Sequence, residues 1–115
     1  MRVVLDMFSG RPNPSFGLAP NEVAELGARA RALSVPSAAP AWPQAGWRGF
    51  IVLGDGLPGS EPIWLRVKEK VVEMQSGTWQ DSTGIEALLE ASARRHGYGA
   101  LLDEARKRTN SGAVL

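Results

Sequence analysis

The chain has 115 residues, a net charge of +1, 43% hydrophobic and 22% charged residues, and no cysteine. This length and composition predict one soluble domain with a single hydrophobic core. The lack of cysteine excludes disulfides, thiolate catalysis and cysteine metal clusters. The small net charge gives no general attraction to nucleic acid or anionic membranes, and no apolar run approaches the ~18 residues of a membrane span. We therefore expect a cytoplasmic protein that binds neither nucleic acid nor membranes.

The first predicted strand covers residues 2–8, in which apolar side chains occupy both alternating faces. This pattern is typical of a central strand, and Asp6 is an unusual charge within it. A return strand is predicted over residues 15–18, so that residues 3–18 would form a hairpin with a wide connection.

The connection is the loop 8–14, with the sequence Phe-Ser-Gly-Arg-Pro-Asn-Pro. Each proline fixes its own φ and moves the preceding residue out of the helical region, while the glycine allows a positive φ. A stiff loop of one shape is therefore predicted, and it would present Ser9, Arg11 and Asn13. These three residues are our first candidates for a binding site.

The remaining elements follow in chain order from periodicity and from turn and capping residues. We predict a helix over 20–33, a proline-rich connector over 34–46, strands over 48–54, 63–67 and 71–75, a last short strand near Trp79, a helix over 83–96 and a short helix over 99–108. The fold class is thus α+β: an antiparallel sheet of four to six strands, two main helices packed on one face, and a short C-terminal helix. Residues 1–108 would form the single domain, with a frayed tail at 109–115.

Arg11 has two interpretations. Its guanidinium could hold a carboxylate or phosphate, with Ser9 and loop amides adding donors. Alternatively, Arg11 pairs internally with Asp6 or Asp55, and Asn13 only caps the turn.

The chain has four tryptophans, of which Trp42 lies within the proline-rich connector and Trp47 follows it directly. Aromatic residues in such a segment can mark a contact surface, where Arg48 could add a cation–π contact. The alternative is that both indoles hold the connector against the body as an ordered strap.

Catalytic and cofactor signals are few. The single histidine, His96, excludes a multi-histidine metal site and argues against a serine triad. No dinucleotide fingerprint or P-loop spacing occurs, so we expect no cofactor and no metal. Asp6 is a weak candidate for an acid/base residue, because a carboxyl group in an apolar strand is a common arrangement for proton transfer.

The run from Val4 to Pro14 resembles the opening of small bacterial proteins of unknown function that share this Phe-Ser-Gly-Arg-Pro-Asn-Pro turn. A helix opened by Pro20 and the later Arg48-Gly49-Phe50 segment add to the resemblance. It implies a shared fold and carries no activity to this chain.

Two functions remain open from the sequence. The first is a binding module that recognises a partner protein or a small ligand through the 8–14 loop and the Trp42/Trp47 strap. The second is a small cofactor-independent enzyme, of cyclase or isomerase type, with Asp6 as acid/base and Arg11 holding an anionic group. A deep pocket containing both residues would favour the enzyme. The oligomeric state is not predicted.

Overall fold

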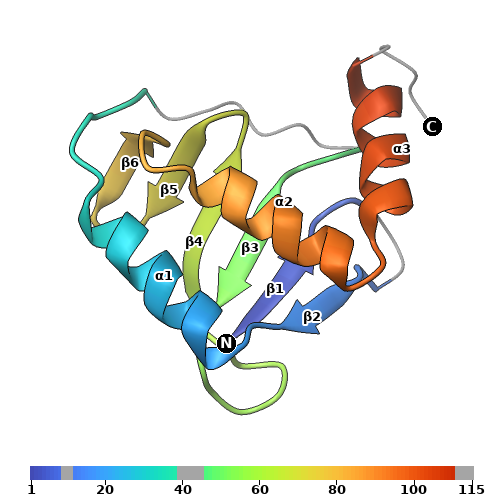
Figure 1. Ribbon diagram of the computed structural model, residues 1–115, viewed down its shortest axis with the longest axis horizontal. Helices are drawn as coiled ribbons and strands as arrows, with labels where there is room; N and C mark the ends of the chain where they lie inside the picture. Colours follow the sequence, from blue (N-terminus) through green and yellow to red (C-terminus); the bar gives the residue numbers. More distant parts are fainter. Residues whose placement is uncertain (9–11, 39–45, 111–115) are drawn as a thin grey trace.

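The computed structural model describes residues 1–8, 12–38 and 46–110, and its sheet has six antiparallel strands in the order β2-β1-β3-β4-β5-β6 (Figure 1). The strands are β1 (Arg2–Leu5), β2 (Ser15–Gly17), β3 (Phe50–Leu53), β4 (Ile63–Lys68), β5 (Val71–Met74) and β6 (Gly77–Gln80). The helices are α1 (Pro20–Arg31), α2 (Ile85–Arg95) and α3 (Gly99–Asn110). The predicted α+β class and antiparallel sheet are confirmed.

The two faces of the sheet differ in what covers them. Figure 1 shows α1 and α2 lying across the same face. Side chains that alternate with period two along the strands point to that face and are fully buried. They are Val3, Leu5, Phe50, Val52, Leu65, Val67 and Val72. The intervening residues, such as the registered row Val4, Ile51 and Arg66, belong to the opposite face and are partly exposed.

β1 ends at Leu5, earlier than the predicted strand, but the chain stays paired for one more residue. The Asp6 amide donates to the Gly49 carbonyl at 3.0 Å, and the Arg48 amide donates to the Asp6 carbonyl at 2.8 Å. Gly49 has a φ of 105°, and a Cβ at this position would lie 2.5 Å from the Val67 carbonyl oxygen. Glycine is therefore required where the chain enters β3.

β4 and β5 are joined by a two-residue turn made by Glu69 and Lys70. Both residues have positive φ, at 50° and 66°. A tight hairpin favours this backbone because its twist matches that of the strands, although Asn-Gly is the usual sequence. β4 extends to Lys68, one residue past its predicted end, so the turn consists of Glu69 and Lys70 alone.

The helices begin with different caps. α1 starts at Pro20, and the Glu22 carboxylate accepts a hydrogen bond from the Ala19 amide. At α2, the Asp81 carboxylate accepts from the amides of Ile85 and Glu86 at 2.7 and 2.8 Å. α3 continues to Asn110, two residues past its predicted end, and has the same length of 12 residues as α1.

The start of the connector lies along the outer edge of β6. The Ser37 amide donates to the Thr78 carbonyl, and the Gln80 amide donates to the Val35 carbonyl, at 3.0 and 2.7 Å. These bonds cover part of an edge that would otherwise offer unpaired backbone groups. Residues 39–45 of the predicted strap lie outside the described residues. Among the helices that the structure describes, none is long and apolar enough to cross a membrane.

Candidate functional site

Asp6 lies at the end of β1 on the sheet face opposite α1 and α2, two residues after Val4 on the same alternation. The residue is only 8% exposed. A buried carboxylate needs hydrogen-bond donors or a counter-charge to offset the loss of water. The structure provides both, from Asn13 nearby in the sequence and from two distant arginines, Arg48 and Arg66.

Arg48 makes the first contact with Asp6. Its guanidinium donates to Asp6 Oδ1 from Nε at 3.1 Å and from Nη2 at 2.9 Å. The same Nη2 donates to the Phe8 carbonyl oxygen at 2.7 Å. One side chain from the start of β3 therefore holds both the carboxylate and the first residue of the 8–14 loop.

Arg66 and Asn13 complete the arrangement. Arg66 Nη2 donates to Asp6 Oδ2 at 3.2 Å, and Asn13 Nδ2 lies 3.4 Å from Asp6 Oδ1. The Asn13 carbonyl oxygen accepts from the amides of Met7 and Phe8 at 3.0 and 2.7 Å. We call Asp6, Asn13, Arg48 and Arg66 the clamp, because together they join the two ends of the loop to the sheet.

The clamp defines what Asp6 can do chemically. Both of its carboxylate oxygens accept hydrogen bonds from guanidinium groups. A general base must instead present an oxygen to the proton that it removes. This arrangement suits a carboxylate that helps to hold the two ends of the loop, at Phe8 and Asn13, better than it suits a proton acceptor.

Trp47 lies on the other side of the chain from Arg48, since neighbouring residues of an extended segment point to opposite faces. It is 2% exposed, packs edge-to-face on Phe50 with 4.9 Å between ring centroids, and lies beneath the Arg106 guanidinium at 5.5 Å. Of the two interpretations of Trp47, this burial favours packing against the body. Its indole forms a rigid floor.

A groove of about 370 Å³ opens above this indole, and we call it the Trp47 groove. It is lined by Trp47, Glu69, Lys70, Glu86 and Arg106. Its walls are thus the β4–β5 turn, the first turn of α2 and the outer half of α3. Two cations and two carboxylates surround one aromatic floor.

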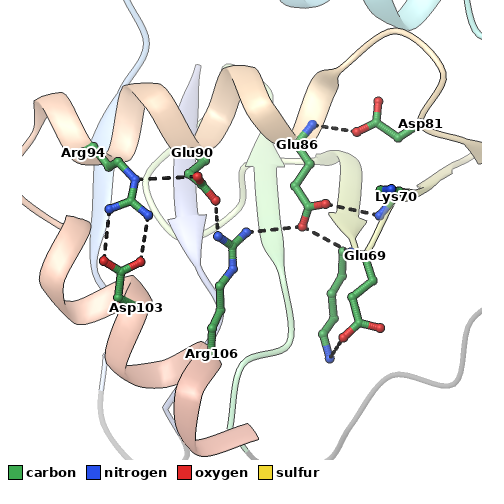
Figure 2. A network of polar contacts seen from close by, with 9 residues as sticks. Glu69, Lys70, Asp81, Glu86, Glu90, Arg94, Asp103 and Arg106 are labelled. Atoms are coloured by element: carbon green, nitrogen blue, oxygen red, sulfur yellow. Dashed lines mark hydrogen bonds and ion pairs between the residues drawn. The ribbon is translucent and has the colours of Figure 1, made fainter. Parts of the chain in front are cut away.

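Figure 2 shows how these charges hold the groove in shape. Glu86 accepts from the amides of Glu69 and Lys70 at 3.1 and 3.2 Å, so one carboxylate satisfies both donors of the strained turn. Arg106 bonds to Glu90 and lies 3.4 Å from Glu86. Arg106 therefore links α3 to α2 and, through Glu86, to the β4–β5 turn.

Further along α2, Arg94 donates to both carboxylate oxygens of Asp103 at 3.1 and 2.7 Å (Figure 2). This hydrogen bonding lowers the pKa of Asp103 and raises that of Arg94. The pair is exposed, so it contributes mainly to the angle between α2 and α3 rather than to stability.

The structure brings together some of the candidate site residues predicted from the sequence, and others lie outside the residues that it describes. Asn13 and Arg48 meet at the clamp with Asp6, and Asn13 caps the turn as its alternative interpretation predicted. Ser9, Arg11 and Trp42 lie outside the described residues, so their roles remain predictions.

Arg66 and Arg106 were missed in the sequence analysis. For Arg66 a signal existed, because it alternates with the buried Leu65 and Val67 and so shares a face with Asp6. For Arg106 no local signal existed, since its partners come from α2 and from the segment before β3.

Comparison of the chain with protein-family models, with curated proteins and with solved structures found no match.

Proposed function

We propose that the protein is a cytoplasmic, non-catalytic module that binds an acidic segment of a partner protein. The contact surface would be the strand end that carries the 8–14 loop, the Trp47 groove and the strap around Trp42. The observation that carries this proposal is the clamp, because its four side chains hold the two ends of the loop, at Phe8 and Asn13, and both carboxylate oxygens of Asp6 already accept hydrogen bonds.

Held loop ends favour binding for an energetic reason. Because Phe8 and Asn13 are already held by hydrogen bonds, they lose little conformational entropy when a partner docks, so more of the contact energy appears as affinity. Pro12 is exposed beside the clamp, and Arg11 directly precedes it in the sequence. Arginine is enriched among the residues that dominate protein interfaces, and it grips carboxylates bidentately.

The Trp47 groove supports a protein partner over a small ligand. Its lining alternates in charge, with Lys70 and Arg106 beside Glu69 and Glu86, over a shallow aromatic floor. Such a mixed polar surface is typical of an interface rim, whereas small-molecule sites are mostly apolar cavities.

The test starts with affinity capture by the wild-type chain, Arg11→Ala and Lys107→Ala, which removes an exposed cation of α3 as the matched control. Any protein retained by the wild type and the control but lost with Arg11→Ala is then purified and titrated. We expect its affinity to fall about 30-fold in Arg11→Ala, since losing one partner of a desolvated charge pair costs ~2 kcal/mol or more.

The same variant tests whether Arg11 is structural. Asp6 has its counter-charges in Arg48 and Arg66, so Arg11→Ala should change the unfolding free energy by no more than ~0.5 kcal/mol. A fall in Tm of about 10 °C would contradict the proposal, because ~1 kcal/mol moves a domain of this size by only ~4–8 °C. Capture that never depends on Arg11 would contradict it as well.

A further inference from the structure

A second groove lies between the C-terminal half of α1 and the strands β4, β5 and β6, at the opposite ends of β4 and β5 from their shared turn. Its volume is about 420 Å³, and we call it the α1 groove. It is lined by Gly27, Ala30, Arg31, Leu33, Trp64, Met74, Ser76 and Trp79. A neighbouring hollow of about 410 Å³ shares Trp64, Met74 and Ser76 with it and extends to the exposed Ile63.

The walls of the α1 groove are mostly apolar and partly aromatic. Trp64 and Trp79 are both half-buried, so each packs on the body and still presents surface to the groove. Met74 lies between their strands and adds a polarisable thioether that makes favourable contacts with aromatic rings. A volume of this size lined by aromatic and aliphatic side chains is typical of small-molecule sites.

Arg31 places one positive charge at the rim. Its Nη1 atom lies 3.2 Å from the position that a Cβ of Gly27 would occupy, so the guanidinium folds back over the previous turn of α1. Glycine within a helix lowers helix stability relative to alanine. At this position its lack of a side chain leaves room for the guanidinium against the groove wall.

Within residues 1–8, 12–38 and 46–108, Arg31 forms no ion pair with a carboxylate. Its neighbour Arg29 differs, because it bonds to Glu25 and to the Gly84 carbonyl oxygen at 2.9 and 2.7 Å. Arg29 thus stabilises the fold, while Arg31 presents its planar guanidinium as a hydrogen-bond donor beside an aromatic cavity.

From this combination we propose that the α1 groove binds a small aromatic carboxylic acid. The ring system lies between the two indoles and Met74, and the carboxylate accepts hydrogen bonds from Arg31 at the rim. The positive charge of Arg31 calls for a ligand with a negative charge, and the two indoles call for a flat apolar ring. This inference does not depend on the proposed partner-binding surface, since the two share no residue.

The test uses 8-anilinonaphthalene-1-sulfonate, an aromatic anion whose fluorescence rises in apolar sites, as the reporter. The folded wild-type chain is titrated with the reporter, which is then displaced by 1-naphthoate or by 1-naphthalenemethanol. These two competitors share the ring system and differ in the carboxylate. We expect 1-naphthoate to displace the reporter at about tenfold lower concentration, because the charge-assisted pair with Arg31 is available to it alone.

Three variants locate the effect. Arg31→Gln should remove the advantage of 1-naphthoate, Arg31→Lys should keep part of it, and Lys107→Gln, a matched loss of charge on α3, should keep all of it. Circular dichroism and Tm confirm that each variant is folded. Equal displacement by both competitors, no reporter binding, or an unchanged advantage in Arg31→Gln would each overturn the proposal.

Discussion

Asp6 and Arg48 are 42 residues apart in the sequence, yet Arg48 donates two hydrogen bonds to a single carboxylate oxygen of Asp6. The pair joins the end of β1 to the start of β3, and its third bond reaches the Phe8 carbonyl. Two of the three stretches on which the sequence resemblance rests, the run that begins at Val4 and the segment Arg48-Gly49-Phe50, are therefore joined at Asp6 and Phe8. Each positions the other.

Arg48→Ala should lower the unfolding free energy by about 3 kcal/mol, because it leaves a largely buried carboxylate with fewer counter-charges. Urea denaturation at neutral pH measures the loss. Asp6→Asn and the double variant complete a cycle, in which we expect the two single losses to overlap by about 1 to 2 kcal/mol. Strictly additive losses would show that the pair contributes no coupling.

Gly49→Ala should destabilise the protein by about 2 to 3 kcal/mol, the range for a residue forced into a sparsely populated backbone region. The φ of 105° and the 2.5 Å approach of a Cβ to the Val67 carbonyl are the causes. Gly17→Ala is the matched control, since a Cβ there would meet nothing within 4 Å. Thermal unfolding should separate the two variants, and equal Tm values would contradict this account.

The strands and helices could be predicted because their signals are local. The alternation of apolar and polar residues predicted the ends of β3, β4 and β5 to within two residues, and Pro20 marked the first residue of α1. The α+β class followed from strands in neighbouring runs, which favour antiparallel pairing.

The candidate site could be predicted only in part, because its contacts cross the sheet. Asn13 accepts hydrogen bonds from amides only five and six residues away. The turn-forming residues around it were therefore enough to suggest its role as a cap. The two arginine partners of Asp6 are 42 and 60 residues away, and the sequence pattern suggested Arg11 instead. Which cation meets a carboxylate depends on strand order and register, and these are set by the whole core.

Lys70→Gly should raise the unfolding free energy by about 1 kcal/mol, because a side chain in the left-handed region costs roughly 1–2 kcal/mol and glycine avoids much of it. Lys70 has a φ of 66°, and its amide would still donate to Glu86 in the variant. Lys70→Ala is the control that removes the charge but keeps the strained backbone, and we expect it to be nearly neutral. If chemical denaturation showed that Lys70→Ala is stabilised as much as Lys70→Gly, this explanation would be contradicted.

Glu22 links α1 to α2 through a nearly buried carboxylate. Its Oε2 atom accepts from the Ser92 hydroxyl and from Arg95, both at 2.6 Å, while Oε1 accepts from the Ala19 amide at 3.0 Å. The hydrogen bond from Ser92 is the main cause that lowers the pKa of Glu22, and burial opposes it. A lowered pKa in the folded state stabilises the protein above the ordinary carboxyl range, and this stabilisation is lost as the pH falls through the folded pKa.

Ser92→Ala should therefore lower the unfolding free energy by about 1.5 to 3 kcal/mol at pH 7, the usual worth of a hydrogen bond to a charged group. The loss should shrink as the pH falls below about 4, because a protonated Glu22 no longer needs the full set of donors. Urea denaturation across this range measures it. In a Glu22→Gln background the same serine change should have no pH dependence, since residue 22 then carries no titrating group. A loss that stays constant from pH 7 to acid in the chain that retains Glu22 would contradict the role assigned to this bond.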